Sequence, residues 1–193
     1  MSYFKITPKA LAHLSKVDKK LAELIATNPQ PQRSLYTSAF ECVVSCIVQQ
    51  QISGTTAEKI FTKIKTQLQQ ITPINTLKAG IENLCKCGLP ERKAQTILSI
   101  AQASTDGTLD FENLNQLSDT EIEKQLSAFK GIGSWTIEML LIFALERPDV
   151  FSTKDFGIKR GFYKLHPNKD IKEYKKRYSP YGTTASIYLW EVK

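Results

Sequence analysis

The sequence predicts an all-α protein, and three observations lead to this fold class. Apolar residues recur every three to four positions along most of the chain, as on one face of a helix, and strand-like alternation is scarce. Two runs, AFECVVSCIVQQ and WTIEMLLIFAL, are apolar on all sides and predict buried helices. Short Gly, Pro and Asn clusters separate the periodic segments, so we expect no repeats and no long linker.

The expected helices follow in order from apolar stripes, caps and breakers. An apolar stripe from Leu11 to Ile25 predicts one helix over about 8–27, which NPQPQRS ends. The buried run AFECVVSCIVQQ ends at QQQISG, and TPINTLKAGIENLCKCGLP reads as short helices closed by a turn. Ser118 and Glu121 form a capping box that begins a helix reaching about Ala128. The remaining expected helices are Thr55–Leu68, RKAQTILSIAQAS, Trp135–Leu145 and about 155–165, 170–177 and 183–190.

Composition and charge narrow the function classes. The chain has 193 residues, 26 Lys and Arg against 19 Asp and Glu, a net charge of +7 and a pI near 9.2, which favours a polyanionic partner. No signal peptide is evident and no window approaches the ~18 apolar residues of a membrane span, so we expect an intracellular protein, in a prokaryotic cytoplasm or a eukaryotic nucleus. The four cysteines lack zinc or iron–sulfur spacing and are expected to be reduced thiols.

A short turn, FKGIGS, separates two helices and is a candidate phosphate site. Gly131 and Gly133 permit positive φ, and Ile132 between them can fill the gap between the helices. The following helix points unpaired N–H groups at the turn, where its dipole favours an anion, with Lys130 alongside. An ordinary helix–helix connection with a C-cap glycine would give the same short pattern.

The segments FKGIGSWTIEMLLIFAL, DVFSTKDFGIKRGF and IVQQQIS together resemble the helix–hairpin–helix superfamily of DNA base-excision glycosylases. The nearest branch is the 3-methyladenine DNA glycosylase II group, which acts on alkylated purines. The similarity runs from about Phe40 to Trp190, and its most specific part is GIG-x-WT followed by Asp155. The resemblance implies a helix–hairpin–helix glycosylase fold with two helical lobes and a cleft between them.

The resemblance also assigns roles to single residues. Asp155 is expected to be the catalytic carboxylate, which stabilises positive charge on the deoxyribose as the glycosidic bond breaks. Trp135 stands where relatives that also cut the backbone have a lysine, so we expect no lyase step, and its indole suits stacking on a cationic alkylated base. An N-cap role for Asp155 and a core role for Trp135 are the alternatives.

Other matched positions complete the expected site. The base pocket would include Met139, which replaces an aromatic residue of some relatives, with Tyr36 and Phe40, although core packing suits Phe40 better. The wedge loop CGLPERKA has Glu91 where relatives have an apolar residue, so Leu89 or Pro90 is expected to fill the gap left by the flipped base. The remaining expected DNA contacts are Gln50, Gln51 and Ser53 in QQQIS, and Lys130, Gly131, Ile132, Gly133, Ser134 and Thr136 in the hairpin.

The prediction is therefore one glycosylase unit over 1–193, with lobes of about 35–150 and of 1–34 plus 151–193, and no extra β domain. We expect a monomeric, monofunctional glycosylase that flips and removes alkylated purines of the 3-methyladenine or 7-methylguanine type from double-stranded DNA. It needs no cofactor, no membrane and no metal, although hairpin carbonyls such as those of Gly131 and Gly133 can hold an alkali cation in this superfamily. A glycosylase for another damaged base and a non-catalytic helix–hairpin–helix DNA-binding protein are the alternatives.

Overall fold

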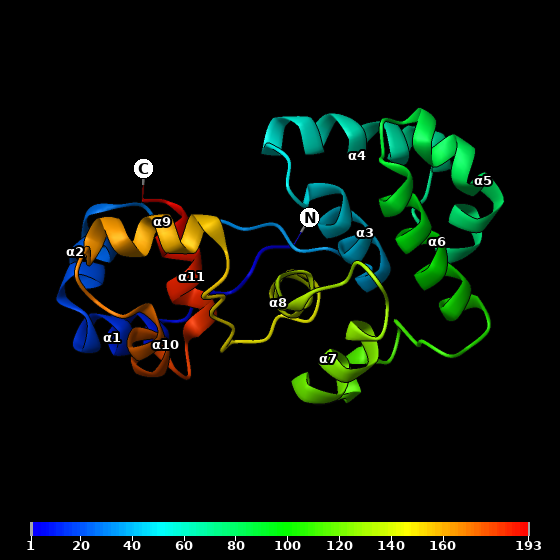
Figure 1. The fold of residues 1–193 in the computed structure, drawn as a ribbon. Helices are drawn as coiled ribbons and strands as arrows, with labels where there is room; N and C mark the ends of the chain where they lie inside the picture. Colours follow the sequence, from blue (N-terminus) through cyan, green and yellow to red (C-terminus); the bar gives the residue numbers. More distant parts are fainter. Residues whose placement is uncertain (1, 193) are drawn as a thin grey trace. The chain divides into compact units, whose positions relative to one another are not determined.

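The computed structural model describes residues 2–192 and confirms the all-α fold class (Figure 1). Across these residues it contains eleven α-helices and one 3-10 helix, and the β pairing there is one isolated antiparallel bridge between Tyr3 and Ser34. The chain forms two units: unit 1 is Met1–Leu35 with Leu141–Lys193, and unit 2 is Tyr36–Leu140. Unit 2 is thus inserted in the sequence of unit 1.

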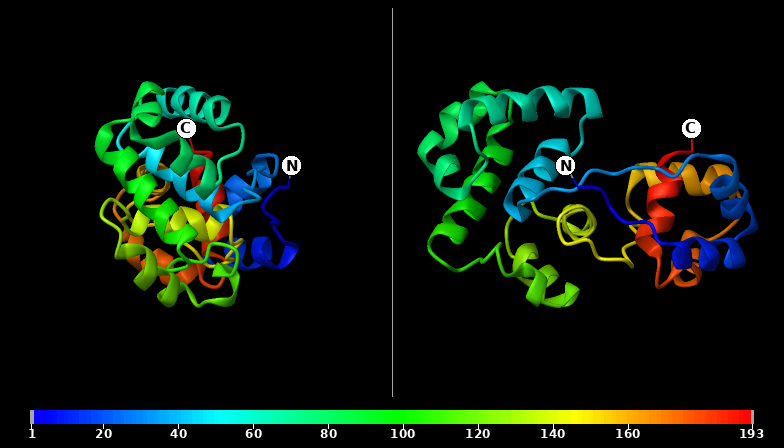
Figure 2. Two further views of the ribbon diagram at one scale, coloured as in Figure 1. Left: turned by 90° about the vertical axis from the view of Figure 1, so that its right-hand side faces the viewer. Right: turned by 180° about the vertical axis from the view of Figure 1, so that it is seen from behind.

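Unit 1 is built from both ends of the chain around α11. In the right-hand view of Figure 2, this red helix lies among the blue N-terminal helices and the orange C-terminal ones, all of which it contacts. Its core is apolar and aromatic, and Tyr178, Phe162 and Tyr188 are among its most buried side chains. The helices of unit 1 are α1 (Pro8–Val17), α2 (Lys19–Thr27), α9 (Phe156–Leu165), α10 (Ile171–Tyr178) and α11 (Gly182–Trp190).

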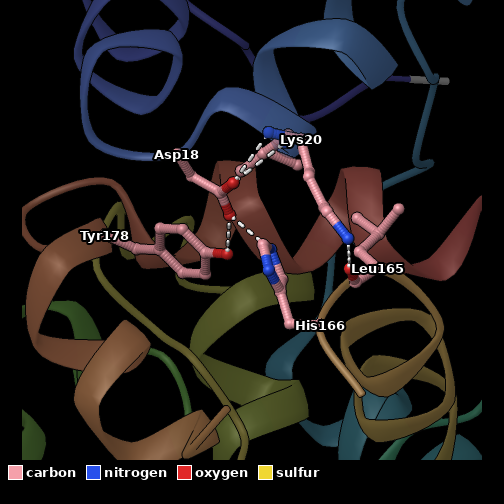
Figure 3. Close-up of polar contacts among 6 residues, drawn as sticks. Asp18, Lys20, Leu165, His166 and Tyr178 are labelled. Carbon is pink, nitrogen blue, oxygen red and sulfur yellow. Dashed lines mark hydrogen bonds and ion pairs between the residues drawn. The ribbon is translucent and has the colours of Figure 1, made fainter. Parts of the chain in front are cut away.

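The single helix expected over 8–27 is wrong, because the chain breaks at Asp18. This residue is extended (φ −145°, ψ 106°), and its Oδ1 accepts from the backbone N–H groups of Lys20 and Leu21, at 3.0 and 3.2 Å, as the N-cap of α2. Its Oδ2 accepts from the Tyr178 hydroxyl at 2.6 Å and contacts His166 Nε2 at 2.9 Å (Figure 3). These distant partners stabilise a break that local periodicity does not reveal.

Burial and the Asp18 carboxylate raise the pKa of Tyr178, so its hydroxyl stays protonated and donates. Lys20 also reaches across this region, where its ammonium donates to the Leu165 carbonyl at 2.5 Å, the C-terminal end of α9. The N-terminal helices are therefore joined to α9 and α10 by polar contacts, which are buried at Asp18 and exposed at Lys20, as well as by apolar packing.

Two glycines let α9 and α11 approach closely. A Cβ on Gly161 would lie 2.1 Å from the Leu189 carbonyl oxygen, a backbone atom that cannot move aside alone. Gly157, one turn earlier, leaves the same kind of space for Trp190. The DFGIKRG segment is therefore a helix whose glycine face accommodates the C-terminal end of α11.

Unit 2 packs around the buried helix α3, in which every residue from Cys42 to Val48 is buried. Figure 1 shows α5 and α6 lying side by side, in agreement with their extensive contacts. Its elements are α3 (Ala39–Gln49), α4 (Gly54–Leu68), α5 (Pro73–Lys86), α6 (Glu91–Thr105), the 3-10 helix Leu114–Gln116, α7 (Asp119–Ser127) and α8 (Ser134–Phe143), whose last three residues belong to unit 1.

Local signals in unit 2 are confirmed. The capping box that begins α7 is present in both directions, between the Ser118 side chain and the Glu121 backbone and between the Glu121 side chain and the Ser118 backbone. Gly80, at φ 69°, divides α5 into the two short helices expected there. Over residues 2–192, no helix is long and apolar enough to cross a lipid bilayer.

Candidate active site and nucleic-acid interface

Asp155 is the N-cap of α9, and its carboxylate is held in place by two donors. Oδ1 accepts from the Ile158 backbone N–H at 2.7 Å and from the Trp190 indole N–H at 2.8 Å. The Asp155 backbone N–H donates to the Ser152 hydroxyl at 3.2 Å, and the residue is only 9% exposed. The helix dipole favours an anion at this position, so one carboxylate serves as cap and as a candidate catalytic group.

Trp190 at the end of α11 reaches Asp155 because Gly157 makes room for it. A Cβ on Gly157 would lie 2.6 Å from Trp190 Cδ1 and 3.2 Å from Asp155 Oδ1. On its other side, the indole stacks on Phe143, with centroids 5.6 Å apart and planes at 22°. The indole is therefore fixed by packing while its N–H orients the carboxylate.

Three residues around this carboxylate were not predicted from the sequence: Phe156, Gly157 and Trp190. Phe156 follows Asp155 and is 79% exposed, which is unusual for so large an apolar side chain. The sequence does carry one signal of this packing, the pair Gly157 and Gly161. A glycine inside a helix lowers the stability of that helix by about 1 kcal/mol relative to alanine. Two glycines one turn apart therefore indicate a neighbour that approaches the backbone closely.

Asp149, six residues before Asp155, holds the beginning of α11. Its Oδ1 accepts from the Gly182 backbone N–H at 2.9 Å and its Oδ2 from the Ser179 hydroxyl at 2.5 Å. Both contacts lie at the beginning of α11. The Asp149 carboxylate therefore helps to fix the beginning of α11.

The hairpin turns at Gly131, the glycine of the pair that adopts a positive φ, whereas Gly133 does not. Gly131 has φ +98°, and a Cβ there would lie 2.5 Å from Thr96 Oγ1. Ile132 is buried at 6% exposure and fills the turn, whereas Lys130, Gly131 and Gly133 are exposed. Exposed groups at the beginning of α8 are therefore positioned to meet an anion.

Gln50 links the hairpin to Thr136 by hydrogen bonds inside unit 2. Gln50 Nε2 donates to the Gly131 carbonyl and to Thr136 Oγ1, each at 3.0 Å. Thr136 is 1% exposed, so its hydroxyl serves this internal contact and does not face solvent. One lone pair of the Gly131 carbonyl, a suggested cation ligand, is occupied by Gln50. No group of three or more His, Cys, Asp or Glu side chains within 2–192 could hold a metal ion.

The expected base-pocket residues of unit 2 have different surroundings. Tyr36 donates to Ser45 Oγ at 2.8 Å and lines a cavity of about 240 Å³ with Gln49 and Phe61. Burial raises the pKa of Tyr36 to about 12, so its hydroxyl is a donor at neutral pH. Phe40 is a core residue of unit 2, 1% exposed and packed edge-on against Phe111.

Two further expected positions belong to α8. Met139 is 4% exposed, and Trp135 is half-buried near the beginning of the helix. Trp135 therefore retains exposed indole surface, whereas Met139 offers little.

The expected wedge loop and the QQQIS segment expose only some of their residues. Leu89 is 3% exposed and is buried in unit 2, whereas Pro90, Glu91 and Arg92 are exposed at the beginning of α6. Gln51 is exposed with φ 59°, and Ser53 caps α4 by accepting from the Thr56 N–H at 3.3 Å. Among the three expected wedge positions, Pro90 is thus the one that is both apolar and exposed.

Charge is divided unevenly between the units. Of the 26 Lys and Arg, 17 belong to unit 1 and 9 to unit 2. Of the 19 Asp and Glu, 8 belong to unit 1 and 11 to unit 2. Their formal charges are therefore +9 and −2, although the hairpin belongs to unit 2. The electrostatic attraction for a polyanion comes mainly from the unit that carries Asp155.

An all-helical chain with a Gly-x-Gly hairpin and an aspartate-capped helix twenty residues further on has the features of a helix–hairpin–helix repair protein. The chain belongs to the HhH-GPD superfamily of base excision DNA repair proteins, whose model matches residues 44–179. It is 35% identical to DNA-3-methyladenine glycosylase 1 of Schizosaccharomyces pombe, over 95% of this chain and 86% of that protein.

Solved structures agree with this membership. The S. pombe 3-methyladenine DNA glycosylase in complex with abasic DNA superposes with a TM-score of 0.86 at 32% identity, covering 95% of both chains. A DNA-3-methyladenine glycosidase from Bacillus halodurans gives a TM-score of 0.82 at 32% identity, over 99% of this chain and 92% of that one. The resemblance noted in the sequence is confirmed at the level of the family and its fold.

Proposed function

We propose that this protein is a monofunctional DNA glycosylase that hydrolyses the N-glycosidic bond of alkylated purines in double-stranded DNA. The observation that carries the proposal is the Asp155 carboxylate, fixed at the N-terminus of α9 by the Ile158 N–H and the Trp190 indole N–H. It lies in the segment that the family model matches. The relatives named above as 3-methyladenine glycosylases support the choice of alkylated purines.

The chemistry follows from a fixed anion beside a sugar. A 3- or 7-methylated purine carries positive charge, so it departs as a neutral base with the electron pair of the C1′–N bond. Asp155 stabilises the cationic sugar that remains and orients water, whose oxygen bonds to C1′ and whose proton is released. The products are a free base and an abasic site. With Trp135 in place of a lysine nucleophile, no imine forms and the strand stays intact.

The surrounding residues suit an extruded base and a charged backbone. Trp135 is proposed to stack on the base, with a cation–π gain of about 0.5–2 kcal/mol for an alkylated purine. Pro90 is proposed as the wedge, and the hairpin and the positive charge of unit 1 as the phosphate contacts. The logarithm of the affinity for DNA should therefore fall linearly with the logarithm of salt concentration. The enzyme is proposed to act as a monomer.

The test is base release from methylated duplex DNA. The protein is incubated with this DNA, the released bases are identified by chromatography, and the strands are examined for nicks. We expect 3-methyladenine or 7-methylguanine without nicking, and loss of release in Asp155→Asn with DNA binding retained, because asparagine also caps helices.

The matched control is Asp170→Asn, which alters another aspartate N-cap of unit 1, bonded to the Lys172 N–H at 2.9 Å. It should keep full activity. Release of deaminated or oxidised bases alone would favour a different lesion class, and an active Asp155→Asn enzyme would overturn the mechanism.

A further inference from the structure

Lys93, in the first turn of α6, is a buried lysine bonded to main-chain carbonyls and not to a carboxylate. Its ammonium donates to the carbonyl oxygens of Val48 at 2.9 Å and Gln50 at 2.7 Å, and the residue is 7% exposed. These carbonyls end α3, where the helix dipole favours a cation. Burial, with a smaller effect of Arg92, lowers the pKa of Lys93, as expected where no anion compensates the charge.

The contacts continue from Lys93 to the hairpin. The backbone carbonyl of Gln50 accepts from Lys93, while its side-chain amide donates to the Gly131 carbonyl and to Thr136 Oγ1 at 3.0 Å each. A serial path therefore runs from the beginning of α6, through the end of α3, to the turn proposed to bind phosphate.

A second, parallel contact leaves α6 one turn later. Thr96 Oγ1 lies 3.0 Å from the Lys130 carbonyl and 3.0 Å from the Arg92 carbonyl of its own helix, which share its single proton, and the missing side chain of Gly131 leaves room for this threonine. The wedge loop leads directly into the first turn of α6, the turn that carries Lys93, since Pro90 is the N-cap of that helix. The wedge loop, the QQQIS segment and the hairpin therefore all meet at the first turns of α6.

We propose that Lys93 is a positioning residue for DNA binding, which holds the hairpin and the wedge loop at a fixed separation through the end of α3. The proposal rests on the proposed function. A duplex contacted at two rigid points binds well only when their spacing is correct, and displacements near 1 Å can cost about a hundredfold in function. Lys93 itself does not touch the DNA, because its two contacts are internal and its side chain is buried.

Lys93→Met tests this role, because methionine keeps the apolar stem and removes the ammonium. Binding to a duplex with an abasic-site analogue is measured at several salt concentrations, together with thermal unfolding. We expect about tenfold weaker binding at every concentration, with an unchanged slope of log affinity against log salt. A direct phosphate contact would instead reduce that slope by about 1, and this outcome would overturn the proposal.

The matched control is Lys59→Met, an exposed lysine of α4 in the same unit. It removes the same charge and should leave affinity within about twofold of the wild type. Lys93→Arg should recover part of the lost affinity, because its guanidinium can still donate to the two carbonyls. A folded Lys93→Met protein that binds like the wild type would also refute the positioning role.

A double variant separates positioning from general destabilisation. Gln50→Leu breaks the same serial path one step further on, so Lys93→Met should cost less than about twofold in affinity when added to it. Fully additive losses would contradict a shared path. If Lys93→Met does not fold, Thr96→Val examines the parallel contact without changing side-chain volume, and wild-type binding by that variant would argue against α6 as the positioning element. Because binding alone is read, these results stand apart from any failure of base release.

Discussion

Trp190→Phe is the sharpest test of the active-site geometry. Phenylalanine keeps an aromatic ring against Phe143 but removes the N–H that donates to Asp155 at 2.8 Å. A hydrogen bond to a charged group contributes about 1.5–3 kcal/mol, and each 1.36 kcal/mol is a factor of ten in rate. If the bond orients the carboxylate in the transition state, the single-turnover rate of base release should fall about tenfold to a hundredfold.

The assay measures release of 7-methylguanine under saturating enzyme, so that weaker DNA binding does not contribute. The free energy of unfolding should fall by no more than about 1.5–3 kcal/mol, the contribution of this one hydrogen bond, because the α9–α11 packing at Gly161 and Leu189 is untouched. Gly157→Ala keeps the indole and forces it away from Asp155, and it should reproduce the same rate loss. A Trp190→Phe rate within twofold of the wild type would refute the reasoning, since the N–H would then contribute nothing to catalysis.

Three further predictions concern stability. Gly161→Ala should lower the free energy of unfolding by at least about 1–3 kcal/mol in a denaturant titration, because its Cβ meets the Leu189 carbonyl; an unchanged midpoint would contradict the close approach. Asp18→Ala should cost about 3 kcal/mol, measured in the same way, because it removes the N-cap of α2 and leaves the buried Tyr178 hydroxyl and His166 imidazole without their shared partner; a loss below 1 kcal/mol would mean that these contacts contribute little. The pKa of Tyr36 is raised to about 12 in the folded protein, so the protonated hydroxyl contributes its full stability below pH 10, and this contribution is lost as the pH rises through 12. In a denaturant titration, the free energy of unfolding of Tyr36→Phe should therefore decline less between pH 10 and pH 12 than that of the wild type; an equal decline would contradict this role of Tyr36.

Local sequence signals predicted most of the fold. The capping box at Ser118 and the apolar run of α3 needed no distant information, because each depends on residues a few positions apart. The break at Asp18 could not be found in this way, since the apolar stripe passes through it and the partners that stabilise it, His166 and Tyr178, lie about 150 residues further on.

In the candidate site, too, residues with a local sequence signal were predicted, whereas contacts with distant residues were not. Asp155 was predicted from the resemblance, and its cap role from the helix that follows it. The contact with Trp190 was not predicted, because nothing near Asp155 in the sequence specifies which distant donor will reach it. The surroundings of Lys93 were missed for the same reason: a lysine at the beginning of an amphipathic helix is normally exposed, and only the folded unit shows it bonded to the end of α3.

The contacts of Asp18 have a consequence for how the chain is made. The residues of α1 and α2 are synthesised first, whereas the partners of Asp18, the His166 imidazole and the Tyr178 hydroxyl, are synthesised only near the end of translation (Figure 3). The inserted segment Tyr36–Leu140 can close its own core on the ribosome, whereas the leading residues must wait for the last ones. Messages truncated before codon 166 should therefore yield a product whose first thirty-five residues are readily digested by protease.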